Sequence, residues 1–247
     1  MSPGKPTITR TSPRRRSPLS SDQAVVASEL QHHFRDMEQQ KETATFGMWI
    51  FLITEIMFFG GMFCAYLIYR LSYYQSWVDG SQRMDITLGA INTAVLIFSS
   101  LTMAMAVHSA QVGKRNLIIL FLILTLVLGC VFLGIKAVEY HDHWENHELP
   151  GKYFSGLDKN GVDKGWHDVP HTSLYFALYF AMTGMHATHM IIGAGLLIWL
   201  IVAAYKGKFN ENYFSPVENV GLYWHFVDIV WIYLFPLLYL ISHKHTG

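Results

Sequence analysis

The fold of this chain is decided by an apolar run near its C-terminus, which reads YWHFVDIVW over residues 223–231. In this run His225 and Asp228 stand three residues apart, so on a helix they share one face. The wider stretch 220–241 is long enough to cross a bilayer. Because an ionisable side chain in such a helix costs roughly 2.5–3.5 kcal/mol on insertion scales, both side chains should face protein or a polar cavity. The run therefore predicts a membrane helix buried in a specific assembly.

Outside this run the chain contains four more apolar stretches of spanning length. Counted together, the predicted spans cover about residues 46–69, 85–110, 117–137, 172–205 and 220–241. Charged residues make up only 15% of the sequence, which also indicates an integral membrane protein. The predicted fold is an all-α membrane protein, a bundle of five transmembrane helices.

The segments outside these spans are polar. Residues 1–45 carry a basic cluster at 14–16 and lack the apolar core of a signal peptide, so they predict a largely disordered cytoplasmic tail. The cluster either contacts anionic lipid or docks a protein. Basic residues near the membrane favour the N-terminus inside and the C-terminus outside, although Lys136 and three loop lysines count the other way. Residues 140–171 then form an outer loop, and residues 243–247 form a short tail.

Glu55 is the carboxyl that stands out, because it lies inside the first predicted span. A carboxyl in such a span either handles protons or senses a lipid headgroup, or it makes a hydrogen bond that fixes helix packing. The sequence alone leaves both interpretations open.

Histidines occur within the fourth predicted span and just after the third. His186 and His189 share a helix face, and with His225 and Asp228 they could suggest an iron or zinc site. A buried hydrogen-bond network joining spans four and five is the favoured alternative, because polar groups in lipid require partners. Glu139 ends the third span and belongs to the same class of structural polar residue.

Three histidines follow Glu139 at positions 141, 143 and 147. No cysteine accompanies them and the flanks are typical of a loop, so a solvated interfacial patch is favoured over a zinc site. No nucleotide-binding glycine loop, nucleophile elbow or paired-carboxylate motif occurs. The chain is therefore not expected to carry a catalytic site or a metal of its own.

Several ordered motifs together resemble subunit III of haem-copper respiratory oxidases, over about residues 46–231. The matching segments are Gly47-Met48 through Glu55 to Phe58-Phe59, Leu88 to Ser100 with Asn92-Thr93, His108-Ser109, Glu139-Tyr140, Thr183 to Gly193, and Tyr223 to Trp231. Any one of them alone is weak, whereas their common order is highly specific.

The resemblance implies a subunit that carries no haem or copper, packs on subunit I and binds phospholipid in a cleft. It implies support of proton uptake and protection against turnover inactivation within a proton-translocating cytochrome c oxidase of the bacterial cytoplasmic membrane. The family glutamate corresponds to Glu55, while the other matched polar positions correspond to structural residues. Subunit II and small or supercomplex subunits are further expected partners, and nucleic acid is not.

Three departures and several alternatives accompany the resemblance. The common form has seven spans, and its two extra N-terminal helices build one wall of the lipid cleft. The loop 140–171 is also longer than usual, and Thr54 stands where the family has serine. A quinol oxidase subunit III and the homologue that accompanies nitric oxide reductase are close alternatives. A membrane di-iron hydroxylase or desaturase is disfavoured, because its clustered histidine boxes are missing here, and a transporter would want broken helices or repeats.

Overall fold

The computed structural model of the chain describes residues 35–151, 154–157, 160–209 and 213–241. Within these residues the chain forms helices α2 (Met37–Ser72), α3 (Tyr74–Ser81), α4 (Ile86–Gln111), α5 (Arg115–Glu145), α6 (Val169–Tyr205) and α7 (Ser215–Tyr239). The same residues form no β-strand beyond an isolated bridge between Leu157 and Asp163. All of these helices except α3 are long and apolar enough to cross a membrane. This confirms the predicted all-helical architecture with five spans.

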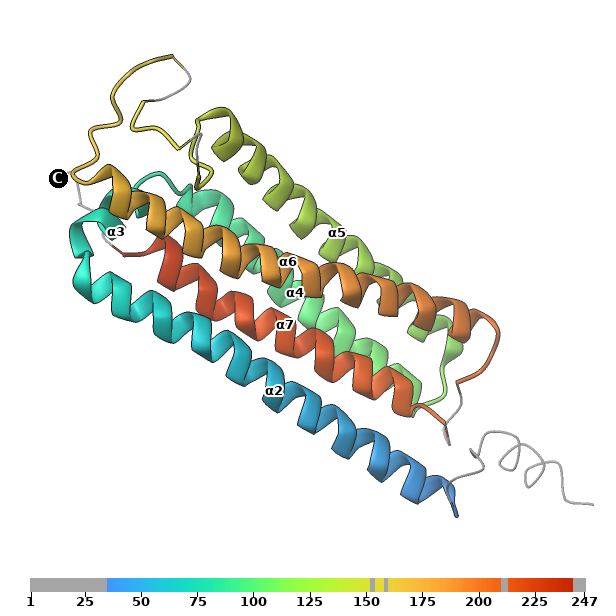
Figure 1. Cartoon of the computed structure of the whole chain (residues 1–247). Helices are drawn as coiled ribbons and strands as arrows, with labels where there is room; N and C mark the ends of the chain where they lie inside the picture. The colour runs from blue at the N-terminus through green and yellow to red at the C-terminus, as the bar shows by residue number, and fades with distance from the viewer. Residues whose placement is uncertain (1–34, 152–153, 158–159, 210–212, 242–247) are drawn as a thin grey trace, which may run out of the picture. The chain divides into compact units, whose positions relative to one another are not determined.

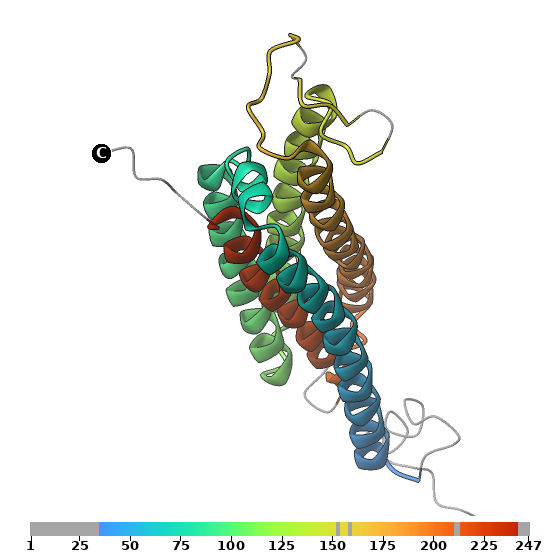
Figure 2. The same ribbon diagram turned by 60° about the vertical axis from the view of Figure 1, so that its left-hand side comes forward.

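The chain divides into two compact units, residues 1–43 and 44–247. Of the first unit the structure describes residues 35–43, which include the first turns of α2. Within the second unit, helices α4 to α7 run side by side and α2 lies along α7 (Figure 1). The view turned by 60° shows α3 and the connection 146–168 at one end of this bundle, called the α3 end below (Figure 2).

Capping residues in the sequence explain where helices α4 and α6 begin. The Asp85 side chain accepts hydrogen bonds from the backbone N–H groups of Thr87 and Leu88, which are otherwise unpaired in the first turn of α4. At α6 the same role falls to Asp168, and a proline follows within the first two helical positions. At the other end of the bundle the Arg115 guanidinium donates to the last carbonyls of α6, including Ala204 O at 3.0 Å. The two caps fix where α4 and α6 begin, and the Arg115 contact ties the start of α5 to the end of α6.

The core of the bundle is built around α7. Of the residues in an 18-residue apolar stretch of α7, 56% are buried inside the bundle, whereas the share in the corresponding stretch of α2 is 17%. The Trp224 ring packs directly against Gly129 and Gly193. A Cβ added at either glycine would lie 2.9 Å from the ring and would clash with it. Two turns further on, the Trp231 ring meets Phe132 with 4.8 Å between ring centroids. Small residues and indole rings thus let α5, α6 and α7 approach closely.

Several helices extend beyond the predicted spans. Helix α2 begins at Met37, so residues 37–45, predicted as part of the disordered tail, are helical; residues 1–34 of that tail lie outside the described residues. Helix α5 continues to Glu145 instead of ending near residue 137, so the connection predicted at 140–171 is shortened to 146–168. The physical reason is that hydropathy marks where lipid ends, whereas polar residues can continue a helix, and no Gly or Pro interrupts the chain between Gly134 and Pro150.

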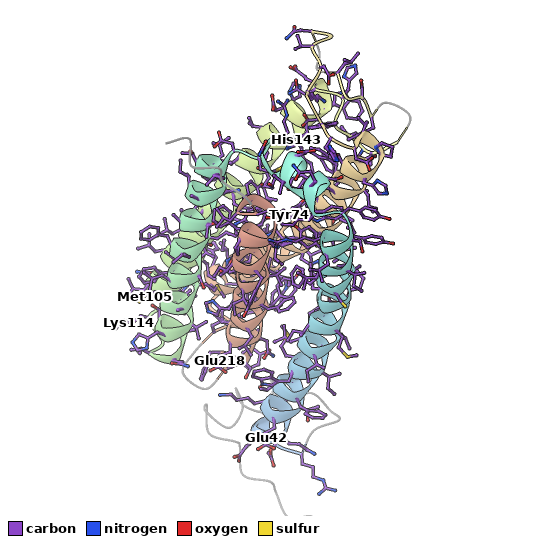
Figure 3. The ribbon with its side chains drawn as sticks, turned by 90° about the vertical axis from the view of Figure 1, so that its left-hand side faces the viewer. Glu42, Tyr74, Met105, Lys114, His143 and Glu218 are labelled. Atoms are coloured by element: carbon purple, nitrogen blue, oxygen red, sulfur yellow. The ribbon has the colours of Figure 1, made fainter. Side chains whose placement is uncertain are left out.

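The α3 end is closed by a buried ion cluster. Glu148, in the connection 146–168, accepts from Arg83 at 2.9 Å and from His143 at 2.5 Å, and lies 3.4 Å from the ammonium of Lys164. Burial alone would raise the pKa of Glu148, but the His143 hydrogen bond and the nearby positive charges outweigh it and hold the pKa below its ordinary value. Figure 3 shows His143 and Tyr74 toward this end, and Lys114 and Glu218 toward the other.

Candidate functional site

The polar side chains of the candidate site begin with Glu55 on α2 and His189 on α6. Glu55 Oε2 and His189 Nε2 are 3.1 Å apart. Their side chains are 21% and 12% exposed, so the pair is sheltered but not sealed. The His189 ring lies 5.3 Å from the Phe59 ring, which covers the pair from α2. The sequence predicted both residues but not that they meet across two helices.

The second hydrogen bond of His189 restricts where its protons can be. His189 Nδ1 lies 2.9 Å from the carbonyl oxygen of Met185. A carbonyl can only accept, so Nδ1 must carry a hydrogen. The bond to Glu55 then has two possible forms: a protonated Glu55 donates to a neutral ring, or an imidazolium donates to a carboxylate. In both forms the pair shares one proton beyond the Nδ1 hydrogen.

The pair opens onto an apolar groove. This groove has a volume of about 360 Å³ and is lined by α2, α6 and α7. Apart from Glu55 and His189 its lining residues are Met48, Phe51, Ile192, Leu196, Asn219, Val220 and Tyr223. A site of this kind can hold an apolar chain and present one exchangeable proton to it or to a neighbouring protein.

A second groove lies on α2 and α7. Its volume is about 470 Å³, and His225 is the polar residue among its aromatic and aliphatic lining residues. His225 Nδ1 bonds the Ser100 hydroxyl of α4 at 2.7 Å. Helix α2 is therefore bordered by two grooves, each with one histidine in its wall.

A polar cluster with more hydrogen bonds than the Glu55 pair lies near the α3 end of α5. The Lys136 ammonium donates to Glu139 at 3.0 Å, to the Tyr179 hydroxyl at 3.1 Å and to the Tyr239 hydroxyl at 2.9 Å. Both tyrosine hydroxyls in turn donate to the other carboxylate oxygen of Glu139. The Lys136 ammonium also lies 4.9 Å from the centroid of the Trp231 ring. The side chains of this ion pair are only 6% and 7% exposed.

The remaining predicted residues do not join into one network. His186 packs against the rings of Phe132 and Trp231, with centroid distances of 5.5 and 5.3 Å. Neither the ring nitrogens of His186 nor the carboxylate oxygens of Asp228 have a hydrogen-bond partner within the described part of the chain. The Ser100 hydroxyl lies near the Asp228 carboxyl without bonding it. Two tyrosine hydroxyls link α6 and α7 directly: Tyr223 donates to the His189 carbonyl at 2.9 Å, and Tyr175 donates to the Leu238 carbonyl at 2.8 Å.

The histidines that follow Glu139 also diverge. His141 is exposed and lies 3.7 Å from Glu145, while His143 is buried against Glu148. The residues that the structure describes contain no group of three or more His, Cys, Asp or Glu side chains placed to hold a metal.

Sequence reasoning missed Lys136, Tyr179 and Tyr239 as members of the polar cluster. The signal for the first was available, because Lys136 and Glu139 are three residues apart and so share a helix face. The tyrosines gave no such signal, because an aromatic residue in an apolar run is typical of any core helix.

Comparison with known proteins matches the family described as "Cytochrome c oxidase subunit III" over residues 25–144 and 168–243. A cytochrome c oxidase subunit 3 of Corynebacterium diphtheriae is 31% identical over 198 residues, which cover 79% of this chain and 87% of that protein. A probable quinol oxidase subunit 3 of Staphylococcus haemolyticus is 29% identical, with 81% and 90% covered. A heme-copper oxidase subunit I+III of Aeropyrum pernix is 28% identical, with 88% of this chain and 25% of that longer protein covered.

Proposed function

We propose, from the premise that this chain belongs to the cytochrome c oxidase subunit III family, that it is the non-catalytic subunit III of an aerobic haem-copper respiratory oxidase. The observation that carries the proposal is the family match, because it spans most of the chain and includes every predicted site residue. The relative that joins subunits I and III in one chain supports contact with subunit I. The haem and copper that reduce oxygen then belong to partner subunits.

Within this role, Glu55 and His189 hold a proton beside a groove and support proton uptake by subunit I. The one-proton arrangement supports this, because either form of the pair can take up or release a proton at an accessible edge. The apolar lining of both grooves supports a bound phospholipid, whose acyl chain would fill them. Glu139, His186, His225 and Asp228 act as structural residues.

The proposed setting is the bacterial cytoplasmic membrane, with the N-terminus inside and the C-terminus outside. The distribution of basic residues supports this orientation. It places the α3 end and the connection 146–168 on the outer side, and the basic residues 114–115 on the inner side. Subunit II and smaller or supercomplex subunits are further proposed contacts.

A quinol oxidase is the second candidate, because one of the similar relatives is named a probable quinol oxidase subunit 3. The two candidates differ in the electron donor of the complex and not in the role of this chain. Oxidation of reduced cytochrome c by the purified complex supports the first candidate, whereas oxidation of a quinol with no cytochrome c activity supports the second.

The proposal is tested by purifying the full chain from native membranes through a C-terminal affinity tag. We expect a haem-containing subunit I to co-purify in stoichiometric amount, with oxygen consumption and bound phospholipid. Elemental analysis of this chain after separation from its partners should show no stoichiometric iron, copper or zinc. A chain that purifies without a haem protein, or that carries its own iron, would contradict the proposal and favour a membrane hydroxylase.

A further inference from the structure

Three polar side chains in the centre of the bundle make no hydrogen bond within the described part of the chain. Asn92 on α4, His186 on α6 and Asp228 on α7 are only 1%, 1% and 2% exposed. Both polar side-chain atoms of each residue have no hydrogen-bond partner among the described residues. Together they present carboxyl, imidazole and amide groups in a region that solvent does not reach.

The packing of α7 shows where Asp228 points. Trp224 and Trp231 lie four residues before and three residues after Asp228, so all three share one face of the helix. Both indole rings reach the bundle centre: the Trp224 ring packs over Gly129 and Gly193, a residue each from α5 and α6. The Asp228 carboxyl therefore enters the same centre, in the layer between the two rings.

The other two side chains border the same layer. The His186 ring lies 5.3 Å from the Trp231 ring. On α4 the Thr93 hydroxyl accepts from the Trp231 indole N–H at 3.1 Å, and the Ser99 hydroxyl accepts from the Trp224 indole N–H at 3.0 Å. Asn92 belongs to the buried stripe of α4, with Gly89, Leu96 and Ser99. Three helices thus direct polar groups at the surroundings of one indole ring.

Polar atoms in this position require partners. A buried hydrogen-bonding group left unsatisfied costs about 1–3 kcal/mol, and in lipid no bulk water can compensate. A buried water molecule typically makes about three hydrogen bonds to such groups. The three side chains offer donors and acceptors from three different helices, which is the environment that holds ordered water.

We infer that the bundle centre next to Trp231 binds a small cluster of ordered water molecules, held by Asn92, His186 and Asp228. This hydration site is flanked by two bonded groups. On one side the Ser100 hydroxyl, close to Asp228, bonds His225 at the wall of a groove. On the other side the Lys136 ammonium lies over the face of Trp231.

The water cluster thereby lies between two polar groups along α7. His225 and Ser100 are bonded to each other on one side of it, and Lys136 and Glu139 are bonded to each other on the other side. The three side chains can hold this water without a metal ion and without a chemical reaction. The hydration site depends on the packing of α4, α6 and α7 and not on the electron donor or the partner subunits proposed above.

A direct test is electron cryomicroscopy of the intact complex in lipid nanodiscs, at a resolution that shows ordered water. We expect separate density peaks at about 2.7–3.2 Å from polar atoms of at least two of the three side chains. Direct hydrogen bonds between the side chains with no such peaks would overturn the inference. A single peak with several oxygen atoms at about 2.3–2.6 Å would also overturn it, because those distances indicate a bound cation.

A second test measures energetic coupling. Asn92→Leu, His186→Phe and Asp228→Leu are compared singly and together by the temperature at which the subunit leaves the complex. Shared water predicts that the triple variant loses less than the sum of the single losses, because apolar replacement of all partners removes the unsatisfied groups. As a control, Thr172→Val, at a buried hydroxyl bonded to its own helix, should add independently to Asp228→Leu. Additive losses for the triple variant would contradict a shared cluster; if the single variants fail to assemble, the wild-type density still decides.

Discussion

Glu139 and Glu55 are both carboxyl groups within membrane helices, yet their surroundings differ sharply. Glu139 is almost fully buried and bonds one ammonium and two hydroxyl groups contributed by α5, α6 and α7. Glu55 is partly exposed beside a groove, and His189 is the side chain that bonds it. The number and type of partners decide what each carboxyl can do.

At Glu139 the Lys136 bond stays within α5, whereas the bonds from Tyr179 and Tyr239 tie α6 and α7 to it. A proton cannot be added there without breaking bonds that hold three helices, so this cluster is suited to structure. At Glu55 the bond to the imidazole survives either placement of the shared proton. The Glu55–His189 pair, called the groove pair below, is therefore suited to exchanging a proton. The cluster of Lys136, Glu139, Tyr179 and Tyr239, called the core cluster below, is suited to holding helices together.

The helices that carry the two carboxyls show the same contrast. Close approach in the core leaves no space at Gly129 and Gly193, whereas a Cβ at Gly60 or Gly61 of α2 meets nothing within 4 Å. Helix α2 is held mainly by aromatic contacts and by the Tyr66 hydroxyl, which donates to the Leu237 carbonyl at 2.5 Å. Looser packing of α2 is consistent with grooves along both of its sides.

The largest effect is expected from Lys136→Met, which would break the core cluster. It leaves Glu139 buried without its counter-charge, and removal of one partner of a buried pair typically costs about 3–5 kcal/mol. We expect loss of the folded subunit from the complex at moderate temperature, measured by retention in detergent during a thermal ramp. The double variant Lys136→Met, Glu139→Gln should recover part of the loss, because it removes both charges. Wild-type retention of the single variant would show that the cluster does not anchor the bundle.

A smaller effect is expected from added methyl groups in the core. Gly193→Ala places a Cβ 2.9 Å from the Trp224 ring, and overpacking of this kind costs about 1–3 kcal/mol. Gly61→Ala is the matched control on α2, where the Cβ meets open space and alanine favours the helix. Thermal retention should fall for the first variant and stay unchanged or rise for the second. Equal losses for the two variants would mean that α2 is as tightly packed in the complex as the core.

A third cluster, at Glu148, both holds the connection 146–168 and depends on the protonation of one carboxyl. Its pKa is held below the ordinary value, so its contribution to stability is fully present above the unfolded pKa of about 4.3 and is lost as pH falls through the lower folded value. We expect the connection 146–168 to become sensitive to protease as pH falls below about 4, with a contribution on the order of 1 kcal/mol. Glu148→Gln should already be sensitive at neutral pH and show no further change in this range. Unchanged protease resistance of the wild type down to pH 3 would contradict this role.

The sequence predicted the fold better than it predicted the contacts. The five spans follow from hydropathy, because lipid demands apolar runs of a minimum length. Helix α3 was missed, because eight residues of mixed polarity give no spanning signal and its burial depends on Trp77 meeting α6. The end of α5 was misplaced for the related reason that polarity does not stop a helix.

The candidate site shows a similar limit. Glu55 was singled out because a carboxyl in an apolar run is costly wherever it lies. That His189, 134 residues away, bonds it could not be predicted, because spacing rules describe one helix and not the packing of two. The same holds for His225, which bonds Ser100 on α4 and not a histidine on α6. Contacts between helices depend on which small residues permit close approach.

The smallest effect on stability, and the sharpest test of the comparison, is expected from Glu55→Gln. The amide N–H of glutamine can donate to His189 Nε2 in place of the protonated carboxyl, so the hydrogen bond persists while the exchangeable proton is lost. We therefore expect less than about 1 kcal/mol of change in retention, far below Lys136→Met. Oxygen consumption should be near wild type at low pH, but it should fall, or the enzyme should inactivate after fewer turnovers, at high pH where protons are scarce. Thr54→Val, which removes a neighbouring hydroxyl bonded to the Phe51 carbonyl, controls for a general disturbance of α2 and should keep the wild-type pH profile. Activity lost at every pH would make Glu55 an obligatory relay, and identical pH profiles and lifetimes would reduce the groove pair to a packing contact like the core cluster.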